Sequence, residues 1–218
     1  PLYLTLAVEE LRVFGVFEQV TQKIKRMGSS LARLQDDMLQ RLEHQHGKDL
    51  LRNMCSLLVL TRDGLLENEL LPLLGRGEAH PLPQAVWAGL YRSVEPLLRP
   101  TATGGHSPLA FLYRATIDAA AHRYVSQRDG GRTVHAALAR FFYSQLASGR
   151  RSVRAVSELP YHLASARDID QLQLLLCNLP FIQLKCFLGM TYDLLGDFAH
   201  AVEVARQVAA AKNTTVST

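Results

Sequence analysis

Apolar residues recur at helical spacing along almost all of this 218-residue chain, and this recurrence limits the fold more than any other feature. Residues three and four apart are neighbours on a helix surface, so such a set forms one apolar face. The first set is Leu4, Ala7, Val8, Leu11 and Phe14. Similar sets follow at residues 31–42 and 134–146. The sequence therefore predicts a mainly all-α fold.

Gly, Pro and Ser residues divide this pattern into separate helices. A break at residues 28–30 ends one helix and caps the next. The segment 48–61 is apolar on nearly all sides, which predicts a central, buried helix. We expect helices over residues 1–14, 16–27, 31–47, 48–61, 67–74, 84–94, 115–126, 133–147, 153–166, 169–178, 181–190 and 192–211.

The middle of the chain does not continue this purely helical pattern. Three expected helices precede two short apolar runs, 97–99 and 109–113, which are separated by a Gly-containing turn at 101–107. Three helices followed by a short β-hairpin is the element order of a winged helix. The last helices, 181–211, partly match the tetratricopeptide pattern of small and aromatic residues.

These patterns predict four parts in order. They are a small helical domain (1–47), a winged-helix-like domain (48–128), an array of helical hairpins that is tetratricopeptide-like at its end (129–212), and a frayed tail (213–218).

The positive charge of the chain is concentrated in one stretch. Nine arginines between Arg114 and Arg167 face only three acidic residues, so this stretch alone exceeds the net charge of +4 of the whole chain. A basic stretch can bind RNA or an acidic protein partner, and Arg150, Arg151 and Arg154 are the candidate contacts. A solvated helix face is the other interpretation of such a run, and both stay open.

Patterns of catalysis and metal binding are missing from the sequence. It has no GxxxxGK[ST] phosphate loop, no HExxH and no GxSxG, so we expect no catalytic residues and no enzyme in this chain. His44 and His46 are two residues apart, which places them on different faces of a helix. The three cysteines form no CxxC, which argues against a zinc site and against a disulfide framework.

Location follows from similar arguments. No apolar run approaches the roughly 18 to 20 residues of a membrane span, so we expect no membrane partner. Together with an odd number of cysteines, this favours a cytoplasmic protein, with the nucleus as an alternative.

The expected helix 84–94 bears on DNA binding. Recognition helices carry several Arg, Lys, Asn or Gln side chains, whereas Arg92 is the one basic residue here. DNA is therefore the least favoured partner. Trp87, Leu90 and Tyr91 have the character of anchors in a core or an interface, and we predict that they bind a neighbouring domain.

Several blocks resemble one family. Pro1-Leu2-Tyr3-Leu4, the blocks 11–14, 17–20 and 61–65, and Glu158-Leu159-Pro160-Tyr161-His162-Leu163 are similar to the region after the nucleotide-binding core of NACHT-type (STAND) NTPases. The likeness includes telomerase-associated members and NACHT–WD40 and NACHT–tetratricopeptide proteins.

The resemblance implies a regulatory and scaffold segment, which packs on the upstream nucleotide-binding domain and couples it to downstream repeats. It also implies that the parent protein binds ATP or GTP and that Pro1 contacts the base of the nucleotide (adenine in ATP), while this chain itself holds no cofactor. Relatives carry a phosphate-sensing histidine at a junction that here corresponds to residues 111–118, which contain none. That role is therefore not carried over.

Overall fold

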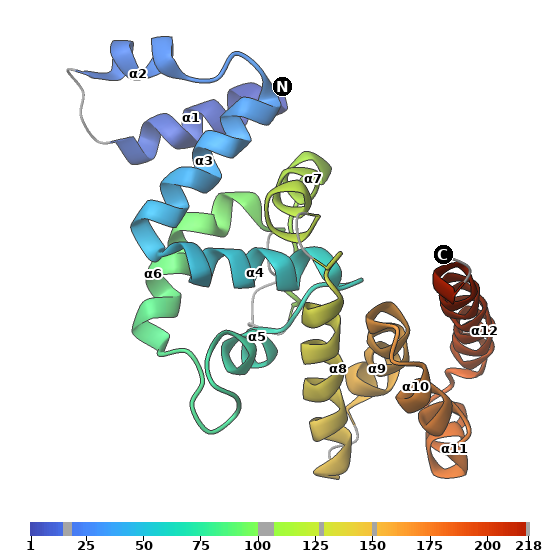
Figure 1. The fold of residues 1–218 in the computed structure, drawn as a ribbon. Coiled ribbons are helices and arrows are strands. Elements are labelled where there is room, and N and C mark those ends of the chain that lie inside the picture. Colours follow the sequence, from blue (N-terminus) through green and yellow to red (C-terminus); the bar gives the residue numbers. More distant parts are fainter. Residues whose placement is uncertain (15–18, 100–106, 127–128, 150–151, 217–218) are drawn as a thin grey trace. The chain divides into compact units, whose positions relative to one another are not determined.

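The computed structural model describes residues 1–14, 19–99, 107–126, 129–149 and 152–216. They form two compact units, Pro1–Gly130 (unit 1) and Gly131–Thr218 (unit 2), which are described separately. Helices make up most of both units (Figure 1), so the predicted all-α class is confirmed. The predicted boundary between residues 47 and 48 lies inside unit 1, and that finer division stays a prediction.

Unit 1 is built around α4, the helix whose sequence is apolar on nearly all sides. Leu51 and Met54 of α4 are fully buried, and α4 packs against α3, α5, α7 and η3. Ser30 caps α3 by accepting a hydrogen bond from the Arg33 N–H at 3.3 Å, as the break at residues 28–30 predicted. The elements of unit 1 are α1 (Leu2–Phe14), α2 (Val20–Arg26), α3 (Leu31–His46), α4 (Lys48–Leu60), α5 (Glu67–Leu74), α6 (Gln84–Val94), the 3₁₀ segment η2 (Glu95–Leu97), α7 (Arg114–Ala120) and the π-helical segment η3 (Ala121–Val125).

The predicted winged helix with its β-hairpin is not supported. Within the described residues no strand forms, and the only β pairing is two isolated antiparallel bridges, Leu65 with Leu109 and Leu98 with Phe111. Leu97 belongs to η2 instead of a strand. Four apolar side chains of these runs, Leu97, Leu98, Leu109 and Phe111, are each less than 5% exposed, so they serve the helical core and not a longer strand ladder. Most of the predicted turn (100–106) lies outside the described residues.

Unit 2 is a series of helices, α8 (Arg132–Ala147), α9 (Val153–Ala166), α10 (Ile169–Leu176), α11 (Leu179–Phe187) and α12 (Thr191–Val216). Side chains cap three of them in succession. Ser152, Asp168 and Asn178 accept hydrogen bonds from backbone N–H groups of α9, α10 and α11 at 3.1–3.2 Å. Such caps fix where each helix begins. The last helix extends to Val216 and so includes part of the tail predicted as frayed.

Polar pairs lie inside unit 2. The Nδ1 atoms of His135 and His162 are 2.9 Å apart between α8 and α9, so one ring donates its proton to the other. Glu158 approaches the second nitrogen of His162 at 3.7 Å. Between α11 and α12, the fully buried Lys185 pairs with Asp197. The His135–His162 and Lys185–Asp197 pairs join consecutive helices, because buried polar groups need partners.

Candidate functional site

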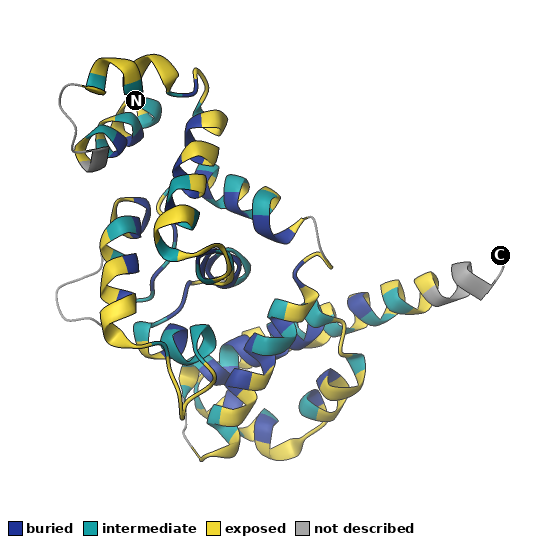
Figure 2. Ribbon diagram, turned by 60° about the vertical axis from the view of Figure 1, so that its left-hand side comes forward, coloured by how far each residue is buried: buried dark blue, intermediate teal, exposed yellow. Residues whose placement is uncertain are grey.

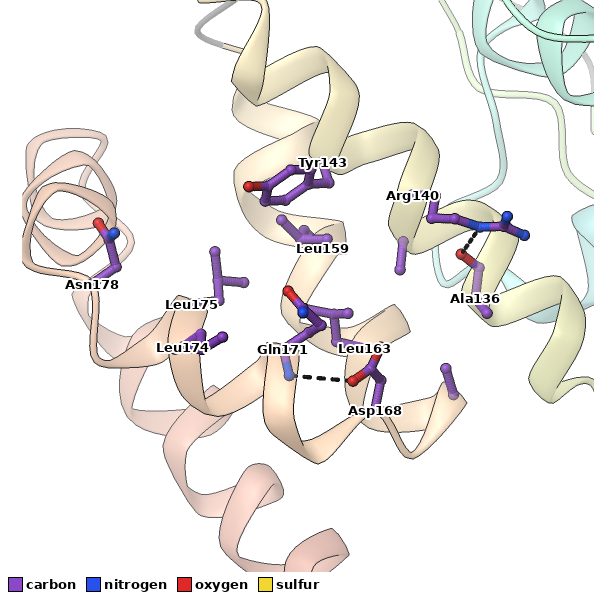
Figure 3. A pocket seen from close by; sticks show the side chains of 12 residues that line it. Ala136, Arg140, Tyr143, Leu159, Leu163, Asp168, Gln171, Leu174, Leu175 and Asn178 are labelled. Carbon is purple, nitrogen blue, oxygen red and sulfur yellow. Dashed lines mark hydrogen bonds between the residues drawn. The ribbon is translucent and has the colours of Figure 1, made fainter.

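A groove between three helices of unit 2 is a candidate binding site. It encloses about 380 Å³, within the range of ligand pockets. Its lining combines apolar side chains of α9 with side chains of α8 and α10 (Figure 3). We call it the α8–α10 groove, and its principal lining residues are Arg140, Tyr143, Leu159, Leu163, Gln171 and Leu174.

Two polar side chains that line the groove already form hydrogen bonds within the chain. Asp168 accepts the Gln171 N–H at 3.2 Å and so serves as the cap of α10. Arg140 donates from Nε to the Ala136 carbonyl at 3.3 Å. Leu174 is 66% exposed at the rim, and Tyr143 is 58% exposed. The groove therefore combines leucine side chains with an exposed cation, which suits a ligand that carries both an apolar group and a carboxylate.

The predicted basic stretch is divided between the two units. Arg114 and Arg123 belong to unit 1 and are already paired, Arg114 with Asp118 at 2.9 Å and Arg123 with Asp36 and Glu43. The other described arginines of the stretch, including Arg140 and Arg154, belong to unit 2. Arg150 and Arg151, two of the three predicted contacts, lie outside the described residues. Their partner-binding role stays a prediction.

The Arg123–Glu43 pair is part of a hydrogen-bonded cluster in unit 1. Arg123 donates from Nε and Nη2 to the two carboxylate oxygens of Glu43 at 2.9 and 3.0 Å, and Tyr124 donates to the same carboxylate at 2.8 Å. The hydrogen bonds from Arg123 lower the pKa of Glu43. Burial raises the pKa of Tyr124, and its bond to Glu43 adds to that shift. The cluster holds η3 against α3 and has a structural role.

The three predicted anchors of helix α6 differ in exposure. Trp87 is 2% exposed and Leu90 is fully buried, so both stabilise unit 1 itself. Tyr91 is half-buried, with its ring 5.6 Å from that of Trp87. Of the three, only Tyr91 keeps surface for a neighbouring domain. The exposed side of α6 carries Arg92 as its one basic residue, which leaves DNA disfavoured.

The first helix exposes the face that the sequence predicted as inward. Leu4 is 66% and Val8 is 54% exposed, whereas Leu6 is fully buried. Polar contacts set this orientation: Tyr3 donates to the Gly28 carbonyl at 2.9 Å, and Glu10, 3% exposed, pairs with Arg41 of α3. We call Leu4 and Val8 the α1 stripe. Helical periodicity could not predict this orientation of α1, because the buried Glu10 breaks the apolar pattern.

Pro1 lies beside the α1 stripe and is exposed. Its carbonyl accepts the Thr5 N–H at 3.1 Å, so it forms part of the first turn. The adenine contact predicted for Pro1 is untested by this geometry and stays a prediction.

A second exposed apolar surface lies on α11 and α12. Its members are Phe187 (79% exposed), Tyr192 (88%), Leu195 (62%), Phe198 (37%) and Val202 (50%), and we call them the α12 face. The opposite side of α12 buries Leu194 and Val204. The sequence analysis missed this surface, although two sets of apolar residues at helical spacing along α12 could have revealed it.

In the described part of the chain, no three His, Cys, Asp or Glu side chains gather as a metal site. None of its helices is both long enough and apolar enough to span a bilayer.

Comparison with known proteins gives relatives that are much longer than this chain. Over 227 residues the chain is 30% identical to telomerase protein component 1 of Mus musculus, covering 89% of this chain and 8% of that protein. It is 24% identical over 245 residues to the NACHT domain- and WD repeat-containing protein 1 of Homo sapiens, covering 91% and 15%. A TPR repeat-containing protein of Dictyostelium discoideum is 26% identical over 184 residues, covering 82% and 10%.

No family model matches the chain, and no solved structure gives a significant match. The chain spans less than a tenth of the length of the telomerase component that it matches. Homologues at 24–30% identity nevertheless include a telomerase component, a NACHT and WD-repeat protein and a TPR-repeat protein, so the predicted relationship of this chain to a NACHT-related region is confirmed.

Proposed function

We propose that this chain is a non-catalytic regulatory and scaffold segment of a NACHT-type NTPase. It packs on the nucleotide-binding core through α1 and couples that core to C-terminal repeats. ATP or GTP is bound by the parent protein, with Pro1 at the base of the nucleotide (adenine in ATP). The names of the relatives, which include NACHT, WD-repeat and TPR-repeat proteins, support this assignment.

The α1 stripe carries the proposal. One side of α1 is anchored on α3 by Leu6 and by the Glu10–Arg41 pair, while the other side presents Leu4 and Val8 to solvent. Burying one such side chain stabilises an interface by about 1.5–3 kcal/mol. A helix fixed on one side and apolar on the other is suited to lie between two domains. Coupling to nucleotide requires that this contact differ between nucleotide states.

The telomerase component among the relatives supports a cytoplasmic or nuclear location.

Hydrogen exchange of the full-length parent protein tests the proposal. We expect amides of residues 2–11 to be protected in one nucleotide state and to exchange faster in the other. The double variant Leu4→Glu/Val8→Glu should remove this difference, because two carboxylates would enter an apolar contact. Thr5→Glu, at an exposed position of the same helix, is the matched control and should retain it. Equal exchange in all nucleotide states would contradict the coupling.

A second candidate function rests on the α8–α10 groove. Arg140 beside Leu159 and Leu163 favours an acidic protein segment that inserts an apolar side chain, whereas RNA needs several cations that track phosphates. The test measures the affinity of the chain for a labelled acidic amphipathic peptide and for a labelled single-stranded RNA. Each is measured at about 50 and about 200 mM salt, a roughly fourfold change. The two affinities distinguish an acidic protein partner from RNA. Arg140→Glu should weaken peptide binding, and Arg114→Glu, in unit 1, should leave it unchanged. Tighter binding of the RNA would reverse the choice of partner.

A further inference from the structure

We infer that the α12 face is the docking surface for a further helical hairpin of the same protein, which stacks on α11 and α12 as the next member of the array. The inference rests on the proposed function and deepens it, because it names the surface through which unit 2 meets the downstream repeats.

The first observation is the exposure of large apolar side chains at this place. Tyr192 and Phe187 are 88% and 79% exposed, and Leu195 adds a third large side chain at 62%. Single exposed apolar residues are ordinary, but a contiguous group of this size on a folded protein marks an interaction site. Helix α12 also carries many exposed residues along its length (Figure 2).

The second observation is that α12 is apolar on two sides. Leu194 and Val204 face the inside of unit 2, where Asp197 also meets the buried Lys185. Tyr192, Leu195 and Val202 recur at helical spacing on a different side of the same helix. A helix at the outer end of an array needs one apolar side only. Two apolar sides are typical of a helix that is covered from both directions.

The third observation identifies the occupant. Helix α12 already covers the preceding members of the array, since it packs against α9, α10 and α11. In stacked helical repeats each member contacts only its neighbours, and a terminal member has a polar outer surface. The α12 face is apolar and lies on a different side of α12 from the buried Leu194 and Val204, as the contact with a next member of a stacked array would. The matching occupant is a helical pair with its own apolar side.

Photo-crosslinking in the full-length protein tests this inference. p-Benzoylphenylalanine replaces Tyr192 or Leu195, both exposed, so that folding is little affected. The control places the same residue at His200, which is exposed on the polar side of α12. We expect mass spectrometry to find intramolecular crosslinks from 192 and 195 to a helical segment outside residues 1–218, at least several times more abundant than from 200.

Three results would overturn the inference: crosslinks to a second copy of the protein, crosslinks to a WD-repeat propeller, or no excess over the His200 control. None of them affects the nucleotide-dependent exchange of α1, which tests the proposed function separately. Failure of α1 exchange with successful crosslinking would in turn leave the docking surface in place without a nucleotide signal.

Discussion

The three cysteines of the chain lie in different surroundings. Cys55 is 1% exposed inside α4, whereas Cys177 and Cys186 are exposed on unit 2. Burial raises the pKa of the Cys55 thiol well above its usual range, and the thiolate is the reactive form. The reactivity of each cysteine thiol therefore depends on whether the fold buries it.

We predict that iodoacetamide modifies Cys177 and Cys186 in the native protein at neutral pH and leaves Cys55 intact. Intact-protein mass spectrometry should show two additions, and a third only after denaturant is added. Rapid labelling of Cys55 without denaturant would mean that α4 opens readily.

The ion pair between Arg123 of η3 and Glu43 of α3 contributes to the stability of unit 1. The pKa of Glu43 is lowered in the folded state, so its stabilising contribution is present above its unfolded pKa of about 4.3 and is lost as pH falls through the lower folded value. The side chains of Glu43 and Arg123 are 10% and 25% exposed, which limits screening by solvent.

Arg123→Gln is expected to destabilise unit 1 by about 2 kcal/mol at pH 7, because it leaves Glu43 without its charged partner. The difference from the unmodified chain should shrink as pH falls below the unfolded pKa of a glutamate and through the lower folded pKa of Glu43, where its carboxylate becomes protonated. Urea unfolding followed by Trp87 fluorescence measures both. Arg114→Gln, which breaks an exposed pair, is the matched control and should change stability by less than about 0.5 kcal/mol. Equal effects of the two changes would contradict this account.

Gly64 controls the approach of the segment before α5 to the Leu109 backbone. Its φ is +76°, and a Cβ at this position would lie 2.2 Å from the Leu109 carbonyl oxygen. That carbonyl accepts the Leu65 N–H at 3.0 Å, so the close approach and the bridge depend on each other. Only glycine satisfies both the conformation and the space.

Gly64→Ala is therefore expected to destabilise unit 1 by about 2–4 kcal/mol through backbone strain and displacement of the bridge. Gly89→Ala, in helix α6 with no atom within 4 Å of the added Cβ, should instead stabilise it by about 0.5–1 kcal/mol. Thermal unfolding by circular dichroism separates the two. If Gly64→Ala lowers the free energy of unfolding by no more than about 0.5 kcal/mol, the level of a neutral surface change, then the segment before α5 can shift to make room for the added Cβ.

At the scale of the whole molecule, large exposed apolar side chains gather toward the first and last helices, on α1 and on α10 to α12. Intermediate helices expose fewer of them, such as Val86 and Tyr143. This distribution agrees with a segment that contacts other domains at α1 and at α12, and it predicts self-association when those domains are missing.

Phe187→Ser together with Tyr192→Ser should reduce self-association of the 218-residue chain severalfold and leave its thermal stability almost unchanged, since both side chains are mostly exposed. Sedimentation velocity over a range of concentrations measures the first effect, and circular dichroism the second. A large fall in melting temperature would show that these side chains support unit 2 itself.

The sequence by itself determined the local structure. The bounds of α5, α6 and α9 agree with the predicted helices, and Ser30 caps α3 where the sequence placed a break. Helices are set by contacts three and four residues apart and by their capping residues, so a short stretch of sequence contains what is needed. The relationship to NACHT-related proteins was likewise carried by short sequence blocks.

Only the tertiary structure decided which side of each helix is covered. The Glu10–Arg41 contact turned the α1 stripe outward, α6 buried Trp87 and Leu90, and Arg123 found its acidic partners about 80 residues earlier in the chain. The same packing reduced the predicted hairpin to two bridges and left the α12 face uncovered. These outcomes depend on residues far apart in sequence, whose contacts exist only after the helices pack, and helical periodicity does not record them.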